Sequence, residues 1–350
     1  MSAWSGKRIF ITGGTGTWGR EFTQQLLDQG AAHVGIYSRG EYRQVEMRRA
    51  FQQYTEITYI LGDVRDLDYL VATTRGYDVI IHLAALKHVP IVEDNPREAV
   101  KTNILGTQNV IDAAGANHVA RVLYVSSDKA VDPLNFYGIT KLAAERMVVA
   151  ANQECPQTQF ITYRAGNVMG SAGSVVPVFQ ETLLSQNLIR LTDPTMTRFF
   201  LSKREVVRLA CHAMEIGLGG EVFIPRMKAT TLDLLSRIMI QHLGRGDVRK
   251  ERIGVRPGEK LHELLIGRNE APRTRSLPDL WVLLPFFVSR KLEAHYAAAP
   301  PVEFEEYGSD TAPAFSHEEL EALLKAEGFL TPAPHMTGPL YFKKDAFDFH

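Results

Sequence analysis

Cysteine, long apolar runs and net charge are all scarce in this sequence. Its two cysteines, Cys155 and Cys211, form no Cys-x-x-Cys pair, which excludes a disulfide framework and favours a reducing, cytoplasmic compartment. The longest apolar run, 280–288, is broken by Pro285 and falls short of the roughly 20 residues that cross a bilayer. The first residues lack the apolar stretch of a signal peptide. We therefore expect a soluble cytoplasmic protein without a membrane partner.

The charge balance excludes two further classes of partner. A formal net charge of -1 gives no general attraction to a polyanion, so we expect no nucleic-acid partner. The histidines lack the spacing of metal ligands, and His262-Glu263 lacks the second histidine of a zinc-protease helix, so we expect no metal. A hydrophobic content of 45% in 350 residues is ordinary for a globular enzyme with a sizeable core.

Short β-branched runs alternate with helical patterns through the first half of the chain. This alternation is typical of βαβ units and predicts an α/β fold with a Rossmann-like, doubly wound parallel sheet. Between the first two runs, Phe22, Leu26 and Leu27 recur at helical spacing, and Gly30 follows where a helix ends. The predicted strands are 9–11, 34–37, 57–60, 79–81, 122–125 and 160–163.

The alternation fades after about residue 170, which predicts a second, smaller unit. We expect a cofactor-binding domain over 1–170, with part of 200–222 added to it, and a C-terminal substrate-binding lobe over 171–330. A late helix is predicted over 317–327, where Leu320, Leu323 and Leu324 share one face. Residues 331–350 are expected to be a tail.

A glycine-rich loop follows the first predicted strand directly and opens a helix. Gly13, Gly16 and Gly19 are three residues apart, with Thr15, Thr17 and Trp18 between them. Without side chains the loop can approach a pyrophosphate closely, and the N–H groups of the helix N-terminus attract its charge. A glycine triplet also occurs in ordinary turns, but here the strand–loop–helix context favours a dinucleotide site over residues 13–19.

The end of the second predicted strand favours NADP over NAD. An acidic residue there would bind a ribose 2′-hydroxyl and repel a 2′-phosphate, whereas this chain has Ser38, Arg39 and, one turn later, Arg43. The alternative is that Arg39 is a solvated surface charge. We also predict cofactor contacts after the third and fourth strands, from Asp63, Val64, Ala84 and Ala85.

A dense set of polar residues follows the fifth predicted strand, at the sheet edge where ligands bind. Tyr137 and Lys141 are four apart on one helix, and a nearby ammonium favours the phenolate needed for proton transfer. Ser127 precedes them, ready to bind a forming carbonyl. The adjacent Asp128 and Lys129 exceed what alcohol oxidation needs and imply further proton transfers, although a surface ion pair is the alternative reading.

These motifs together resemble the nucleotide-sugar branch of the extended short-chain dehydrogenases/reductases. More narrowly, the chain resembles the inverting UDP-N-acetylglucosamine 4,6-dehydratases of pseudaminic-acid and capsule biosynthesis, from about Lys7 to Ile266. The most specific stretch is Asp-Lys-Ala-Val-Asp-Pro at 128–133 running into Tyr-x-x-x-Lys at 137–141. The likeness also rests on 12–19, 37–39, 84–90, 166–168, 192–200 and 256–263.

The resemblance implies a role for each residue after the fifth strand. Tyr137 would take the proton of the sugar 4-hydroxyl, Lys141 would hold the ribose, and Ser127 would bind the forming carbonyl. Lys129 would remove the proton on carbon 5 while Asp128 protonates the departing 6-hydroxyl. The hydride taken from carbon 4 by NADP would return to carbon 6, and carbon 5 would be inverted.

The resemblance also implies where the nucleotide sugar binds. Asn167 and Arg256 suit its diphosphate, because an amide and a bidentate guanidinium match phosphate oxygens. Arg198, Lys87 and Glu259 are further candidates, Lys87 also for the cofactor; Arg198 and Lys87 alternatively form ion pairs between the lobes. Homo-oligomerisation through helices on the sheet face is expected by resemblance.

Two departures from the family pattern lie beside the expected sugar pocket. Ala165 stands where tyrosine is common and Ala172 where arginine is common, so the exact sugar and nucleotide stay open. Retention of configuration at carbon 5, and a 4-epimerase or reductase activity, are alternatives compatible with the same fold. A non-catalytic NADP-sensing module is a remote alternative, since such proteins usually lose the tyrosine or the lysine, and both are present here.

Overall fold

The computed structural model describes residues 2–331; residues 332–350 of the predicted tail lie outside the described part of the chain. Nine strands form the largest sheet, in the order β14-β15-β10-β6-β5-β4-β1-β2-β3. The strands from β3 to β10 pair in parallel, and β15 and β14 add an antiparallel edge. Their bounds are β1 (Arg8–Thr12), β2 (His33–Ser38), β3 (Ile57–Leu61), β4 (Val79–His82), β5 (Arg121–Ser127), β6 (Gln159–Ala165), β10 (Val222–Pro225), β14 (Thr274–Ser276) and β15 (Leu280–Leu283).

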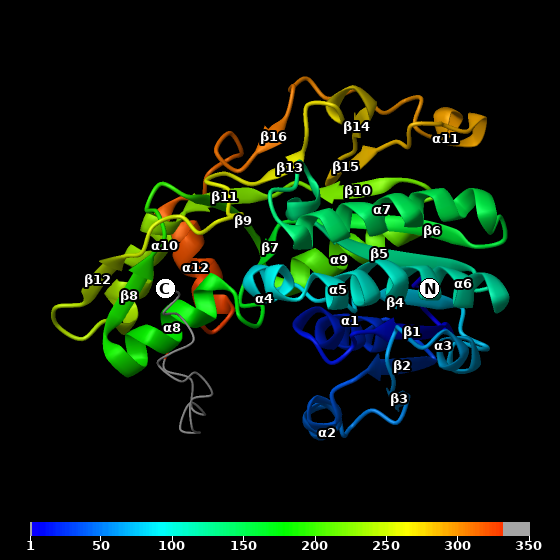
Figure 1. Ribbon diagram of the computed structural model, residues 1–350, viewed down its shortest axis with the longest axis horizontal. Coiled ribbons are helices and arrows are strands. Elements are labelled where there is room, and N and C mark those ends of the chain that lie inside the picture. Colours follow the sequence, from blue (N-terminus) through cyan, green and yellow to red (C-terminus); the bar gives the residue numbers. More distant parts are fainter. Residues whose placement is uncertain (1, 332–350) are drawn as a thin grey trace.

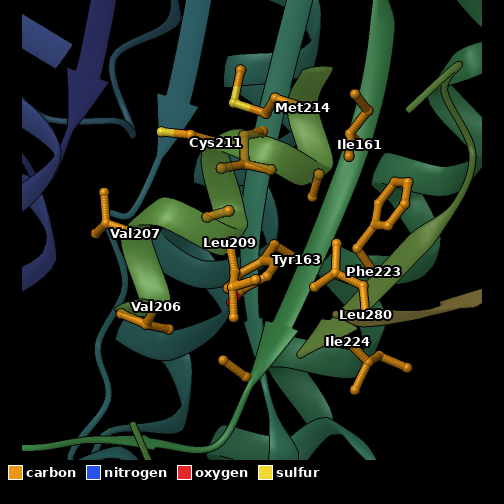
Figure 2. Close-up of a cluster of buried hydrophobic side chains, with 14 of the residues drawn as sticks. Ile161, Tyr163, Val206, Val207, Leu209, Cys211, Met214, Phe223, Ile224 and Leu280 are labelled. Atoms are coloured by element: carbon orange, nitrogen blue, oxygen red, sulfur yellow. The ribbon is translucent and has the colours of Figure 1, made fainter. Parts of the chain in front are cut away.

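Helices cover both faces of this sheet because successive strand residues point to opposite sides. Ile9 and Ile11 of β1 pack with α1 (Thr17–Asp28) and α9 (Lys203–Ile216), whereas Phe10 packs on the other face. That other face is covered by α3 (Leu67–Thr73), α6 (Gly106–Ala116) and α7 (Phe136–Glu154). Figure 2 shows the first face, where apolar side chains of α9 lie against Ile161, Tyr163 and Phe223 of the sheet. Burial on both faces explains the near-continuous apolar runs read from the sequence.

A smaller lobe lies beyond one end of the sheet strands (Figure 1). Its own buried core includes Phe179, Leu235 and Leu320, one from each of three helices. These helices are α8 (Val175–Gln186), α10 (Leu232–Leu243) and α12 (His317–Ala326). The lobe strands are β7 (Asn167–Val168), β8 (Leu188–Leu191), β9 (Thr197–Leu201), β11 (Lys228–Thr231) and β12 (Arg249–Arg252), and a further pair joins β13 (Leu264–Ile266) to β16 (Tyr307–Gly308).

The remaining short elements lie in the connections between strands. They are α2 (Glu41–Ala50), α4 (Val89–Asp94), α5 (Pro96–Ala99), the π-helical turn η1 (Val100–Leu105), the 3-10 turns η2 (Asp128–Ala130) and η3 (Ala271–Arg273), and α11 (Arg290–His295). Between 2 and 331, no helix is both long and apolar enough to cross a membrane, and no three His, Cys, Asp or Glu side chains cluster as metal ligands would.

The predicted fold class is confirmed. All six predicted strands are present in the parallel sheet, and the strand order β3-β2-β1-β4-β5-β6 is that of a doubly wound dinucleotide fold. The predicted helices 22–27 and 317–327 correspond to α1 and α12. The carboxyl ends of the parallel strands face the smaller lobe (Figure 1), so the loops at this edge form the candidate site.

Candidate active site

The glycine loop between β1 and α1 folds tightly against the loop that follows β4. Gly13 has φ +67°, and a Cβ added there would lie 2.8 Å from the backbone nitrogen of Ala84. A Cβ at Gly19 would lie 2.2 Å from the carbonyl oxygen of Gly14, so the first turn of α1 also needs glycine. Gly16 is the N-cap of α1 and no described side chain caps the helix. The first-turn N–H groups are therefore available to an anion.

The other loop residues support this arrangement. Trp18 stacks on Phe22, with ring centroids 6.3 Å apart. Thr15 is buried, and the Thr17 hydroxyl accepts a hydrogen bond from the backbone N–H of Ala172, 3.4 Å away. Residue 172 of the smaller lobe thus lies over the glycine loop.

The end of β2 places a guanidinium, not a carboxylate, beside the predicted ribose position. Ser38 is buried and its hydroxyl accepts from Gln44, 3.1 Å away. Arg39 is 3.6 Å from Asp63, and its side chain is 47% exposed. Asp63 is held by Arg65 at 2.6 Å and also accepts the Tyr37 hydroxyl on its carbonyl oxygen.

The other predicted cofactor residues line the loops around this position. Val64 is buried, whereas Ala84 and Ala85 are half-buried after β4. Arg43 and Lys87 are exposed. Partial desolvation lowers the pKa of Lys87, and the positive charges of Arg43 and Lys129 lower it further. Lys87 therefore lies between the predicted cofactor side and the polar cluster after β5.

That cluster begins where β5 ends and η2 follows at once. Asp128 is 1% exposed. Its Oδ1 accepts from the Ser127 hydroxyl at 2.8 Å and from the Lys129 ammonium at 3.1 Å. Its second oxygen, Oδ2, is buried without a hydrogen-bond partner among the described residues. The structure therefore brings Ser127, Asp128 and Lys129 together in one largely buried cluster, in which the Lys129 side chain is 24% exposed, rather than in an exposed surface ion pair.

A fourth member of this cluster, Glu263, comes from a distant part of the chain. Its Oε1 lies 3.3 Å from Lys129 Nζ, and the side chain is 4% exposed. Burial lowers the pKa of Lys129, but the negative charges of Asp128 and Glu263 outweigh it, so the pKa is raised. The sequence analysis placed Glu263 in the resemblance stretch 256–263 and rejected it as part of a zinc motif, but it missed this contact, which no local pattern reveals.

Tyr137 and Lys141 lie on one face of α7 beside the cluster. Asn135 caps this helix by accepting the Gly138 N–H, 2.8 Å away. Burial raises the pKa of Tyr137, while the positive charge of Lys129 and a hydrogen bond with Ser127 oppose that rise. Ser127 thus contacts both Asp128 and Tyr137. Such a joined set is able to move protons to and from one bound molecule.

Lys141 is buried under Tyr137 and has no carboxylate in direct contact among the described residues. Its ammonium donates to the Val125 carbonyl at 2.6 Å and lies 4.2 Å from the centre of the Tyr124 ring. Burial lowers the pKa of Lys141 to about 7, against the opposing charge of Glu145. Lys141 can therefore be either charged or uncharged near neutral pH.

The predicted substrate residues lie in three places around the cluster. Asn167 opens β7, after β6. Arg256 and Glu259 lie in a loop anchored to the start of α7, where Asn135 donates to the Gly258 carbonyl at 2.9 Å. Arg198 is buried, with its guanidinium donating to the carbonyls of Thr197 and Leu261 and lying 3.9 Å from Glu263. Arg198 thus contacts protein groups extensively, whereas Arg256 is exposed.

The two departures from the family pattern both lie next to functional loops. Ala165 is the register partner of Ser127 on neighbouring strands and is 2% exposed. Ala172 is exposed beside Thr17. The residue types at these positions therefore shape the space beside Ser127 and the glycine loop.

Comparison with known proteins gives the same family as the motifs. The model of a family described as polysaccharide biosynthesis protein matches residues 9–285. The chain belongs to this family. It is 38% identical, over 93% of its length and 99% of the relative's, to a UDP-N-acetylglucosamine 4,6-dehydratase (inverting) of Campylobacter jejuni. The predicted family resemblance is thereby confirmed.

Other members of the family differ in their named activities. A UDP-glucose 4-epimerase of Rickettsia akari is 36% identical over 77% of this chain and 81% of the relative. Among solved structures, Pen from Bacillus thuringiensis is 37% identical and superimposes with a TM-score of 0.87, covering 94% of this chain and 100% of that one. Family membership alone therefore does not separate dehydration from epimerisation.

Proposed function

We propose that this protein is a UDP-N-acetylglucosamine 4,6-dehydratase that inverts carbon 5 and forms a 6-deoxy-4-keto sugar. The observation that carries the proposal is the buried cluster of Ser127, Asp128 and Lys129 beside Tyr137. An epimerase needs to exchange a proton only at the 4-hydroxyl, which Tyr137 can do. A dehydratase also needs an acid and a base for carbons 5 and 6, and the cluster supplies both.

The glycine loop fits a nicotinamide dinucleotide, and we infer NADP rather than NAD. A side chain at Gly13 or Gly19 would collide with backbone, and the uncapped start of α1 suits a pyrophosphate. Arg39, with Arg43 one turn later, suits a 2′-phosphate, and Ser38, Asp63, Val64, Ala84, Ala85 and Lys87 would line the remaining surface. When bound, the nicotinamide would accept hydride from carbon 4 and return it to carbon 6.

The protein groups would manage the protons of the reaction. Tyr137 accepts the proton of the 4-hydroxyl, and Ser127 hydrogen-bonds the carbonyl oxygen that forms. The 4-ketone makes the carbon 5 proton acidic, Lys129 removes it, and Asp128 donates a proton to the 6-hydroxyl as water leaves. Once carbon 6 has received the hydride, carbon 5 takes a proton that comes from solvent, on the opposite face, which inverts this centre. Lys141 orients the ribose and tunes Tyr137 through its charge. Asn167, Arg256, Glu259, Lys87 and Arg198 are the proposed contacts of the nucleotide diphosphate and its surroundings.

The experiment that tests dehydration against epimerisation is Lys129→Met assayed on UDP-N-acetylglucosamine. Mass spectrometry is expected to show loss of one water from the substrate with the unchanged protein and at least about a hundredfold slower loss with the variant, since general base catalysis contributes about 10²–10⁴-fold. A 4-epimer formed at equal rates by both proteins would favour the epimerase instead. Binding of NADP without turnover of any UDP-sugar would favour the sensing module.

We also propose a homo-oligomer that works in the cytoplasm. Large apolar side chains are exposed on neighbouring helices of one face: Ile91 of α4 is 54% exposed, Leu105 of η1 52% and Ile139 of α7 47%. Large apolar side chains exposed on elements that pack together favour a protein interface there. Light scattering is expected to give a mass above that of one chain, and Ile139→Lys is expected to lower it. The two free cysteines fit a reducing compartment.

A further inference from the structure

The Lys129 ammonium lies between two buried carboxylates, of which the proposed mechanism uses only one. Asp128 Oδ1 is 3.1 Å from Lys129 Nζ and Glu263 Oε1 is 3.3 Å from it. The outer oxygens, Asp128 Oδ2 and Glu263 Oε2, are both buried without a hydrogen-bond partner among the described residues. Burying two carboxylates with unpaired oxygens beside one amine costs desolvation free energy, which packing alone does not explain.

Glu263 is held rigidly at this position. Its backbone N–H donates to the Ser309 hydroxyl at 2.9 Å, and its carbonyl oxygen accepts the Ser309 N–H at 2.8 Å. Arg198 Nε lies 3.9 Å from the same Oε1 that faces Lys129. The carboxylate is thus fixed between two cations before any substrate arrives.

The movement of protons during elimination indicates a role for the Glu263 carboxylate. Elimination of water needs an uncharged Lys129 as base and a protonated Asp128 as acid, which is the ion pair of the structure with one proton moved from Nζ to Oδ1. As the carbon 5–hydrogen bond breaks, Lys129 gains that proton; as the carbon 6–oxygen bond breaks, Asp128 gives its proton to the leaving hydroxyl. Water is released, and the Lys129–Asp128 ion pair is restored. Positive charge therefore develops on Nζ during elimination, next to Glu263.

From this juxtaposition we propose that Glu263 is a positioning residue for elimination: it fixes the Lys129 amine and stabilises the ammonium that forms when the carbon 5 proton is removed. The inference rests on the proposed function. It predicts that Glu263 acts on proton removal at carbon 5 and not on oxidation at carbon 4, because Tyr137 and Ser127 do not contact it in the described structure. A negative charge close to Nζ makes the uncharged lysine a stronger base.

The pH dependence follows from the groups that face Lys129. These are Asp128 on η2, Glu263 before β13, Arg198 on β9, and Tyr137 on α7; Lys87 and Lys260 also lie close enough for their charges to interact with Lys129. The reactive pair must carry one proton between Lys129 and Asp128. Loss of that proton at high pH stops elimination, and Glu263 raises the pKa of Lys129 that governs this loss. Removing the charge of Glu263 is therefore expected to lower the pH at which the elimination rate falls on the alkaline side of its pH profile, which we call the alkaline limb.

The test compares Glu263→Gln and Glu263→Asp with Glu215→Gln, a matched control on α9 with a partly exposed carboxylate. Elimination is followed as product formation and as deuterium entry at carbon 5, and oxidation as the absorbance of reduced nicotinamide. In Glu263→Gln we expect elimination to fall about ten- to a hundredfold, with reduced nicotinamide accumulating, and the alkaline limb to fall by about one pH unit or more. Glu263→Asp, which keeps the charge, is expected to restore the position of the limb.

The outcomes separate this inference from the function on which it rests. If the unchanged protein forms no dehydrated sugar, the proposed function fails and the inference with it. If the unchanged protein is active and Glu263→Gln keeps its rate and its alkaline limb, the inference alone is overturned. It is also overturned if both variants lose oxidation and elimination equally, or if thermal unfolding shows that both are unfolded, because Glu263 is then only structural.

Discussion

Arg164 is the most deeply buried charge of the large sheet, and its removal tests how the site is held together. Its guanidinium is 0% exposed and binds Glu145 of α7 at 2.5 Å and Glu270 at 2.7 Å. It also donates to the Leu265 carbonyl at 3.0 Å. Arg164 thereby joins β6, the helix that carries Tyr137, and the segment that follows Glu263. In Arg164→Met, the carboxylates of Glu145 and Glu270 lose the guanidinium that both of them contact directly in the core.

We expect Arg164→Met to lower the free energy of unfolding by about 3–5 kcal/mol, the cost of breaking a buried ion pair on one side. Arg190→Met is the matched control: Arg190 lies 2.9 Å from Glu251, but both side chains are more than a third exposed, so the expected loss is about 0–1 kcal/mol. Urea unfolding at pH 7, followed by circular dichroism, measures both. Equal losses in the two variants would refute the reasoning.

The loss of stability caused by Arg164→Met is also expected to depend on pH, in a direction that the pKa of Glu270 determines. Burial raises the pKa of Glu270, but Arg164 outweighs it, so the pKa is lowered. A lowered carboxylate pKa stabilises the fold above the unfolded value of about 4.3 and loses this effect as the pH falls. Without Arg164, only the Gly267 backbone N–H and the charge of Arg146 still oppose the effect of burial, so the pKa of Glu270 is expected to rise. The difference in free energy of unfolding between the unchanged protein and Arg164→Met is therefore expected to be larger at pH 7 than at pH 4.

Three further predictions concern the cofactor side of the site. Gly13→Ala adds a Cβ 2.8 Å from the Ala84 nitrogen, so calorimetric titration is expected to show at least about tenfold weaker NADP binding. The control is Gly76→Ala, where φ is +78° and a Cβ would meet nothing within 4 Å; this variant is expected to bind NADP as the unchanged protein does. Arg39→Ala is expected to weaken NADP binding about ten- to a hundredfold and NAD binding little, since one charge-assisted contact contributes about 1.5–3 kcal/mol. Equal weakening of NADP and NAD binding would contradict the assignment of Arg39 to the 2′-phosphate. Lys141 has a pKa lowered to about 7, so its burial destabilises the fold most below pH 7. Lys141→Met is therefore expected to raise the unfolding temperature more at pH 6 than at pH 9, and the opposite trend would refute this.

Much of the fold follows from local sequence patterns because the central strands are buried on both faces. The runs at 9–11 and 122–125 are apolar and rich in β-branched residues, which identifies them as strands without any tertiary information. β10, β14 and β15 have only three or four residues each, as short as strands of the smaller lobe, so no local pattern assigns them to the large sheet. Their positions depend on pairing with β6 and with each other.

The candidate site was predictable only where its residues are close in sequence. Ser127, Asp128 and Lys129 are consecutive, and Tyr137 and Lys141 share a helix face, so helical and strand geometry bring them together. Glu263 reaches Lys129 only because β13 packs beside η2. Ala165 lies beside Ser127 only through the register of β5 and β6. Contacts of this kind depend on how distant segments pack and have no signature in one sequence.

The central claim is that one cluster of acid, amine and phenol removes water from a UDP-linked hexose. The most direct measurement is the NMR spectrum of the product formed from UDP-N-acetylglucosamine in heavy water. We predict a 6-deoxy-4-keto sugar with deuterium at carbon 5 and inverted configuration there. A product that keeps its 6-hydroxyl, or a dehydrated product with protium or retained configuration at carbon 5, would contradict it.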